Sequence, residues 1–221
     1  MITLHHCPQS RSMRTLWLLR ELGVEFRVVE HPFDKSLRRP EFLKLSPAGR
    51  VPALEIDGQH MFETGAMTEI LCERFSPDTL GRRADSPDRS DWLIWVHFAE
   101  TISQHAAALT QQHVALYEDH MRSPIVMKIE AARLGKCFDA IEARLGGGGT
   151  DQAYLLASGF SAADVSVGQA VYMAAHFATL DAHPATAAWY ARITERSAFI
   201  ASLPGPGGGL YDQDFYPPWE G

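Results

Sequence analysis

The sequence predicts a small α/β domain at residues 1–80 and an all-helical domain at residues 91–221, joined by a linker at residues 81–90. Up to residue 80, short apolar runs typical of β-strands alternate with helical stretches, as in α/β proteins. After residue 90, apolar residues recur at helical spacing. The segment between the two regions is polar and basic and carries turn signals, as a linker does.

The expected elements of the first domain follow from two periodicities. Alternating apolar and polar residues predict strands, and apolar residues four apart predict helices. In chain order we expect a strand at residues 2–6, a helix at 13–22, strands at 26–29, 53–56 and 60–62, and a helix at 66–74.

The second domain is expected to pack three amphipathic helices and to end in an aromatic tail. The apolar stripes of these helices begin at Trp92, Leu134 and Val167. The run Gly146 to Gly149 is expected to end the second helix, and Pro184 to begin a fourth. The tail carries four aromatic residues, and two roles stay open for it: covering a hydrophobic pocket or sealing the helical domain (Tyr211, Phe215, Tyr216, Trp219).

Composition excludes several classes of function. A chain of 221 residues with 46% hydrophobic content can bury a large core. Its formal charge of −7 and the absence of a basic run argue against nucleic acid and anionic membrane surfaces as partners. The N-terminus does not resemble a signal peptide, and no apolar run is long enough to span a membrane, so we expect a cytoplasmic protein.

The cysteines and histidines do not suggest a disulfide framework or a metal site. Cys7, Cys72 and Cys137 are widely separated and form no CxxC pair, which favours free thiols. His5 and His6 are adjacent in a predicted strand and therefore face opposite sides of the sheet. We expect no bound metal.

The most informative segment is Cys7-Pro8-Gln9-Ser10-Arg11-Ser12, which places a thiol and two hydroxyls where the first strand turns into the first helix. Ser10 or Ser12 is expected to cap this helix. The first N–H groups of a helix carry a partial positive charge, so they stabilise a thiolate held beside them. The alternative is that Cys7 only ends a buried strand and that Ser10 is only a cap.

Two further segments of the first domain favour binding of a peptide-like ligand. Pro52 stands at the entrance of a predicted strand, and a cis Val51-Pro52 bond would turn the backbone of Val51 outward to pair with such a ligand. Glu63 and Thr64 stand where a strand ends and a helix begins, with Thr64 as the expected cap. The Glu63 carboxylate would bind an ammonium group and the Thr64 cap a carboxylate. A solvated Glu63 and an ordinary edge-strand proline are the alternatives.

Taken together, these motifs resemble the cytosolic glutathione transferase family over nearly the whole chain. The resemblance implies a thioredoxin-like first domain, an all-α second domain, a homodimer and glutathione as cosubstrate. The matching segments are Ser10 to Arg14 with the loop after the first strand, Arg50-Val51-Pro52 with the cis-proline segment, Glu63-Thr64 with the pair that holds the γ-glutamyl end of glutathione, and Phe160 to Val165 with the capping-box segment.

The resemblance leaves two nucleophile schemes open. Ser10 resembles the catalytic serine of theta-like members, which donates a hydrogen bond to the glutathione thiolate before it attacks a small hydrophobic electrophile. Cys7-Pro8 resembles the Cys-Pro motif of glutaredoxins and omega-class members, in which the cysteine itself exchanges disulfides. In both schemes Arg50, Val51, Pro52, Glu63 and Thr64 are expected to hold the tripeptide. A binding module without catalysis is the third possibility.

Overall fold

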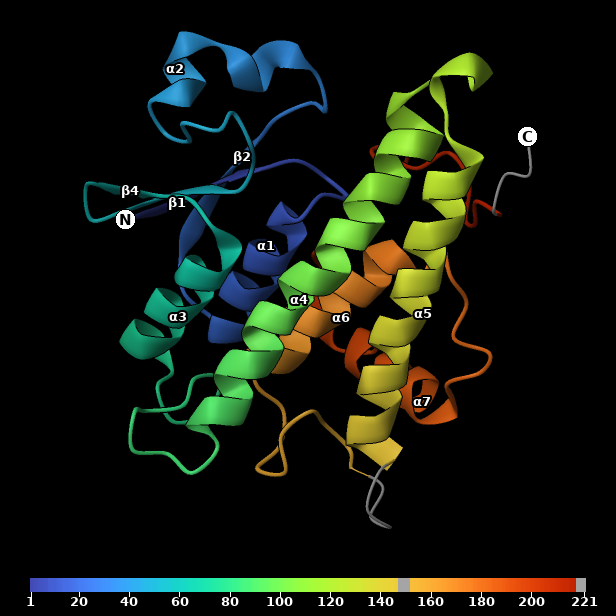
Figure 1. The fold of residues 1–221 in the computed structure, drawn as a ribbon. Helices are drawn as coiled ribbons and strands as arrows, with labels where there is room; N and C mark the ends of the chain where they lie inside the picture. The colour runs from blue at the N-terminus through green and yellow to red at the C-terminus, as the bar shows by residue number, and fades with distance from the viewer. Residues whose placement is uncertain (147–151, 218–221) are drawn as a thin grey trace.

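The first domain is a four-stranded mixed sheet with helices on both faces (Figure 1). The computed structural model describes residues 1–146 and 152–217. The strands lie in the order β2-β1-β3-β4, with β1 parallel to β2 and antiparallel to β3, and Leu4 at the centre of the sheet lies opposite Val28 and Leu54. Their bounds are β1 Ile2–His6, β2 Phe26–Glu30, β3 Ala53–Ile56 and β4 Gln59–Met61. This is the predicted thioredoxin-like arrangement.

Helices α1 and α3 cover one face of the sheet, and α2 lies over the other (Figure 1). Their bounds are α1 Ser12–Leu22, α2 Pro40–Leu43 and α3 Thr64–Phe75, and a 3₁₀ helix, Lys35–Arg38, precedes α2. The long helices and all four strands confirm the predicted elements to within a residue or two. The 3₁₀ helix and α2 have four residues each, too few to show a helical period, and were not predicted.

The second domain is helical, as predicted, and α6 is its buried centre. Its longer helices are α4 Arg89–Thr110, α5 Pro124–Gly146, α6 Ala162–Ala174 and α7 Pro184–Thr194. Shorter segments are the π-helical turn Gln111–Ala115, the 3₁₀ turn Asp119–Met121 and α8 Ser197–Ile200. Helix α5 ends at Gly146, whereas Gly147 to Gly149 of the predicted helix stop and Trp219 of the tail lie outside the described residues. The segment between α3 and α4 contains residue 80, and the domain limits at 80 and 91 stay a prediction.

The capping box predicted at the start of α6 is present. The Ser161 side chain accepts the N–H of Ala163, and Asp164 accepts the N–H of Ser161 at 2.9 Å. Asp164 also accepts the N–H of Leu155 and the indole N–H of Trp189, each at 2.9 Å. The carboxylate therefore joins α6, α7 and the loop between α5 and α6 as well as beginning a helix.

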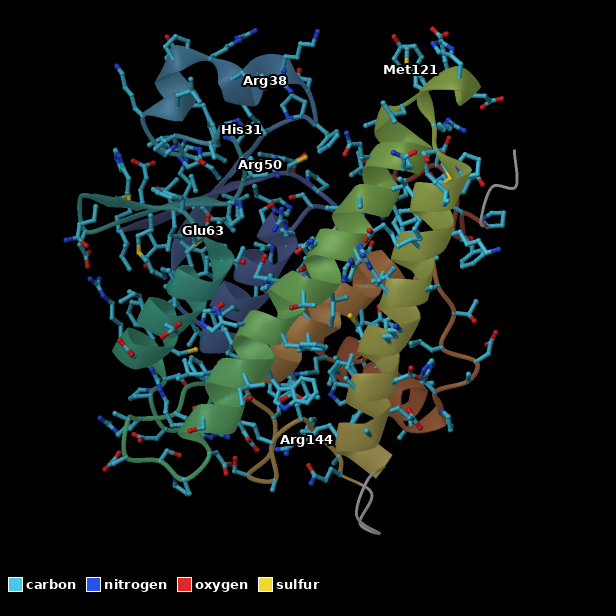
Figure 2. All side chains as sticks on the ribbon, in the orientation of Figure 1. His31, Arg38, Arg50, Glu63, Met121 and Arg144 are labelled. Atoms are coloured by element: carbon cyan, nitrogen blue, oxygen red, sulfur yellow. The ribbon has the colours of Figure 1, made fainter. Side chains whose placement is uncertain are left out.

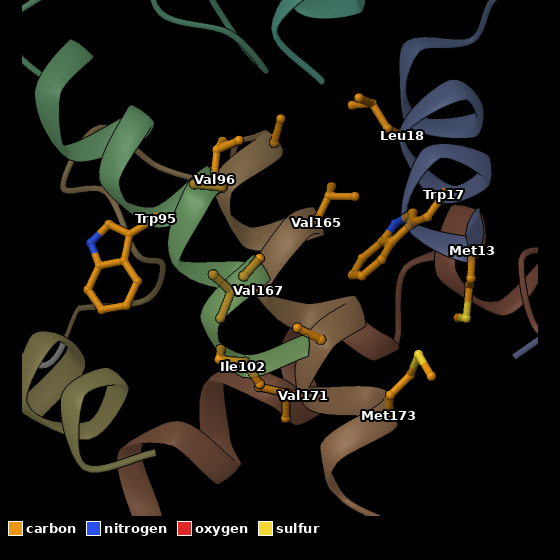
Figure 3. Close-up of a cluster of buried hydrophobic side chains, with 14 of the residues drawn as sticks. Met13, Trp17, Leu18, Trp95, Val96, Ile102, Val165, Val167, Val171 and Met173 are labelled. Atoms are coloured by element: carbon orange, nitrogen blue, oxygen red, sulfur yellow. The ribbon is translucent and has the colours of Figure 1, made fainter. Parts of the chain in front are cut away.

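The two domains share one core, in which Trp17 of α1 packs against α6 (Figure 3). A Cβ atom built on Gly168 of α6 would lie 3.1 Å from the Trp17 ring and 2.5 Å from Cδ1 of Ile193. The close approach of α1 and α6 thus requires a residue without a side chain at position 168. In the part of the chain that the structure describes, no helix is long and apolar enough to cross a membrane.

Candidate functional site

The loop between β1 and α1 carries the two candidate nucleophiles, Cys7 and Ser10. Cys7 directly follows β1 and is 2% exposed, and its Sγ lies 3.8 Å from the carbonyl oxygen of Pro8. Burial, with smaller contributions from the charges of Glu30 and Asp34, raises the pKa of the Cys7 thiol to about 11. Burial therefore opposes the ionisation of this sulfur, which the disulfide-exchange scheme requires.

Ser10 is half-buried and is part of a cluster of short hydrogen bonds. Its hydroxyl donates to the carbonyl of Cys7 at 2.8 Å and lies 2.7 Å from Oγ of Ser12. The prediction of a serine at the N-cap of α1 was wrong, because Arg11 occupies that position and its side chain makes no capping hydrogen bond. Ser10 Oγ instead accepts the N–H of Ser12 at 3.2 Å, which tightens the turn that precedes α1.

All five residues predicted to hold the tripeptide line one pocket. They are Arg50, Val51, Pro52, Glu63 and Thr64, and the pocket is completed by Arg11, Ser46, Ala48, Phe62 and Glu100. Figure 2 shows Arg50 and Glu63 on the first domain, on the side where it meets α4. Ser10 does not line this pocket, but its neighbour Arg11 does, so the pocket begins one residue from the candidate serine.

The backbone around this pocket has unusual features at two positions. The Val51-Pro52 peptide bond is cis, as predicted. Glu63 has φ +77°, a value that is rare for a residue with a side chain and that recurs at ligand-binding sites. Helix α3 begins at Thr64 with Glu63 at the N-cap position, so the predicted Thr64 cap was wrong. The Thr64 hydroxyl lies in the domain interface, where it donates to Oε1 of Glu100 at 2.6 Å.

An ion-pair network beneath the pocket was missed by reasoning from the sequence. Arg14, 1% exposed, pairs with Oε1 of Glu100 and donates to Thr64 at 3.0 Å and to Ser103 at 2.8 Å. Arg11 donates to Oε2 of Glu100 at 2.9 Å. Burial alone would raise the pKa of Glu100, but the two arginine charges and the Thr64 hydroxyl lower it to about 2. The sequence signals this network only through Glu100, a single carboxylate next to Ala99, which belongs to the apolar stripe of the predicted helix.

The C-terminal tail reaches back to the same loop. Gln9, with φ +51°, donates to the Tyr172 hydroxyl at 2.9 Å and accepts the N–H of Tyr211 at 3.0 Å. The Tyr211 hydroxyl bonds Thr110 of α4 at 2.8 Å, and Tyr216 is buried in the helical core. Of the two roles left open for the tail, its described part therefore seals the helical domain, and it also holds the loop that carries Ser10.

A thioredoxin-like domain that is packed on a helical domain and has a cis-proline pocket at their junction defines the class of glutathione transferases. The family model "Glutathione S-transferase, N-terminal domain" matches residues 1–71, and "Glutathione S-transferase, C-terminal domain" matches residues 104–192. The chain belongs to the glutathione S-transferase family.

Two plant relatives match most of the chain, and one from Schizosaccharomyces pombe matches 45% of it. Glutathione S-transferase 4 of Zea mays is 30% identical over 84% of this chain and 83% of its own length. Glutathione S-transferase F13 of Arabidopsis thaliana is 28% identical over 87% of this chain and 90% of its own length. Glutathione S-transferase 3 of Schizosaccharomyces pombe is 33% identical, but the chain spans only 41% of that protein.

Solved structures share the fold. The glutathione transferase URE2P8 of Phanerochaete chrysosporium, crystallised with oxidized glutathione, superposes with a TM-score of 0.80 at 23% identity, over 91% of this chain and 92% of that one. Glutathione transferase F7 of Populus trichocarpa gives a TM-score of 0.77 at 25% identity, over 91% and 97% of the two chains.

Proposed function

We propose that this protein is a glutathione transferase that binds glutathione in the cis-proline pocket and uses Ser10 to stabilise the glutathione thiolate for attack on a small hydrophobic electrophile. The observation that carries the proposal is the convergence of Arg50, Val51, Pro52, Glu63 and Thr64 on one pocket beside the Ser10 loop. These residues come from two separate segments of the sequence, residues 50–52 and 63–64, and each segment resembles a different family motif.

The charges of the pocket suit a zwitterionic peptide. Arg50 and Glu63 are exposed, and neither forms an ion pair with any residue that the structure describes. The Glu63 carboxylate is available for an ammonium group and the Arg50 guanidinium for a carboxylate, and both interactions are charge-assisted hydrogen bonds. Between them, the backbone of Val51 stands just before β3, where an extended peptide can pair with it.

Thr64 contributes differently from what the sequence suggested. Its hydroxyl is committed to Glu100 and Arg14, so we assign ligand binding at this position to the backbone N–H at the start of α3. A carboxylate there would interact with the positive end of the helix. The hydroxyl would act indirectly, by fixing the orientation of the pocket against α4.

Ser10 is the better candidate for the chemical role. Its hydroxyl is partly accessible and needs only a rotation to turn from the Cys7 carbonyl toward an incoming sulfur. A thiol pKa lowered by about two units corresponds to about 2.7 kcal/mol, which a charge-assisted hydrogen bond and the N–H groups of α1 can supply together. With a pKa near 11, the Cys7 thiol is protonated at neutral pH, which argues against the disulfide-exchange scheme.

We also propose that the protein forms a homodimer. Phe62, Phe75 and Ile94 are 46%, 43% and 60% exposed, and they lie on the pocket rim, at the end of α3 and on α4. The proposal rests on the family resemblance, and these three side chains are the candidates for burial against a second copy. Light scattering that gives the mass of a monomer at micromolar concentration would contradict this.

The function is tested by comparing Ser10→Ala and Cys7→Ser with the wild type. The assays are conjugation of chlorodinitrobenzene, reduction of a small mixed disulfide, and calorimetry with glutathione. We expect Ser10→Ala to lower kcat/KM for conjugation by about 10²-fold while glutathione still binds, and Cys7→Ser to have little effect. Ser90→Ala, on the exposed first turn of α4, and Cys137→Ser are the matched controls.

The same experiment separates the alternatives. Full conjugating activity in Ser10→Ala, with loss of disulfide reduction in Cys7→Ser, would favour the reductase. Tight binding of glutathione without turnover of either substrate in the wild type would favour a binding module.

A further inference from the structure

A chain of side-chain hydrogen bonds runs from His6 through Ser12 to Ser10. Nδ1 of His6 lies 2.8 Å from Oγ of Ser12, which lies 2.7 Å from Oγ of Ser10. His6 is 4% exposed and Ser12 is fully buried. The role proposed above for Ser10 uses neither His6 nor the Ser12 hydroxyl, although both are buried and the Ser12 hydroxyl contacts Ser10 directly.

The direction of the protons in this chain depends on His6. Ser12 Oγ already accepts the N–H of Cys7 at 3.0 Å, and a hydroxyl accepts two hydrogen bonds and donates one. If His6 carries its proton on Nδ1, it fills the second acceptor position of Ser12. The Ser12 proton can then go to Ser10 or to the Cys7 carbonyl at 3.1 Å. If His6 carries its proton on Nε2, the Ser12 proton is drawn to Nδ1 instead.

The first arrangement fixes what Ser10 can do. Its oxygen accepts the N–H of Ser12 at 3.2 Å. Because the N–H groups of Cys7 and His6 fill both acceptor positions of the Ser12 oxygen, Ser12 cannot accept the Ser10 proton. The Ser10 proton can then only be donated away from the chain, to the Cys7 carbonyl at 2.8 Å or to a sulfur that replaces that acceptor. In the second arrangement the Ser12 oxygen attracts the Ser10 proton inward.

We propose that neutral His6, protonated on Nδ1, is a positioning residue that orders the Ser12 and Ser10 protons so that Ser10 donates outward to the glutathione sulfur. This inference rests on the role proposed above for Ser10. Because each hydrogen bond in such a chain polarises the next, the ordered chain makes Ser10 a stronger donor than an isolated serine.

The surroundings of His6 favour this protonation. The ring lines a pocket that also contains Arg20 and Glu30, and burial, with a further contribution from the Arg20 charge, lowers the pKa of His6 to about 4. The ring is therefore neutral at physiological pH and has a single N–H. A proton on Nδ1 points to the Ser12 oxygen at 2.8 Å, whereas no hydrogen bond joins Nε2 to any residue that the structure describes.

The variants His6→Leu and His6→Asn test the proposal. Leucine removes the donor, whereas the amide nitrogen of asparagine can donate from the position of Nδ1. The readouts are the ultraviolet absorbance of enzyme-bound glutathione thiolate as a function of pH, and the pH profile of kcat/KM with chlorodinitrobenzene. We expect His6→Leu to raise the pKa of the bound thiol by about one unit, a tenfold loss of thiolate below that pKa, and His6→Asn to restore it.

Binding and coupling provide the controls. The affinity for S-methylglutathione, which has no thiol, should be the same in wild type and His6→Leu, since His6 does not line the cis-proline pocket. In a Ser10→Ala background, His6→Leu should cause no further rise of the thiol pKa, because the hydrogen-bond chain then lacks the Ser10 hydroxyl that donates to the sulfur.

The outcomes distinguish the two proposals. A normal thiol pKa in Ser10→Ala would refute the role of Ser10 itself. A raised pKa in Ser10→Ala with a normal pKa in His6→Leu would refute only the positioning role, as would equal defects in His6→Leu and His6→Asn. Nitrogen NMR of the wild-type ring, assigned by the signals lost in His6→Asn, does not depend on how His6→Leu folds. It should show the proton on Nδ1, and a proton on Nε2 would overturn the proposal.

Discussion

Replacing Glu100 by glutamine should lower the free energy of unfolding, because this one carboxylate joins the two domains beside the cis-proline pocket. Glu100 belongs to α4, and its partners Arg11, Arg14 and Thr64 belong to the first domain. The amide keeps the shape of the side chain and removes its charge. Arg14, 1% exposed, would then be a buried cation without an ionised partner.

The size of the effect follows from the pKa of Glu100. A fall from 4.5 to about 2 corresponds to about 3 kcal/mol of stabilisation. One third of the side chain is exposed to water, which weakens the interaction, so we reduce this to about 2 kcal/mol. Removing one partner of a fully buried ion pair costs about 3–5 kcal/mol, and partial exposure places Glu100 below that range. We expect Glu100→Gln to lose about 2 kcal/mol of unfolding free energy.

Urea unfolding at neutral pH and fixed protein concentration measures this loss. The matched control is Glu73→Gln, whose carboxylate is 54% exposed and 3.6 Å from Arg89, and it should change stability by less than about 0.5 kcal/mol. Because the pKa is lowered on folding, the Glu100 contribution is complete above the unfolded value of 4.5 and is lost as pH falls toward about 2. Wild type and Glu100→Gln should therefore converge in acid. A loss at neutral pH no larger than that of the control would refute the reasoning.

Three further predictions concern packing, capping and the buried thiol. Gly168→Ala should lose about 1–3 kcal/mol in urea unfolding, because its methyl group would press on the Trp17 ring. Asp164→Ala should lose about 3–5 kcal/mol in the same assay, since it leaves three buried N–H groups, one of them from Trp189, without an acceptor. Cys7 should react slowly with iodoacetamide at neutral pH and faster only as pH approaches about 11; rapid neutral alkylation would contradict its burial.

Hydrophobic periodicity was sufficient to predict the strands and the long helices. The β3 run Ala53–Ile56 and the stripe that begins at Trp92 are both long enough to show their period, and both lie in the core. Helix α2 has a single turn, so it has no period to detect. Its position is fixed by packing of Phe42 over the sheet, which is a tertiary effect.

The residues that line the cis-proline pocket were predicted more completely than the hydrogen bonds of the loop at its edge. Pocket residues such as Glu63 stand at strand ends and helix starts, where short motifs carry the signal. The capping prediction failed at Ser10 because its hydroxyl and that of Ser12 bond to the Cys7 carbonyl and to each other. The Arg14–Glu100 pair joins residues 86 positions apart, and a single sequence contains no signal that links them.

The loop that carries Ser10 is held by the helical domain at three successive residues. Gln9 bonds Tyr172 and the tail, the Ser10 carbonyl accepts from Gln169 of α6 at 3.4 Å, and Arg11 pairs with Glu100 of α4. A donor that must face a sulfur needs a fixed orientation, and a surface loop alone would not provide it. The packing of α1 on α6 therefore supports the geometry of the proposed thiolate site as well as the stability of the fold. It follows that a substitution at this interface can raise the thiol pKa of bound glutathione while every residue in contact with the ligand is unchanged.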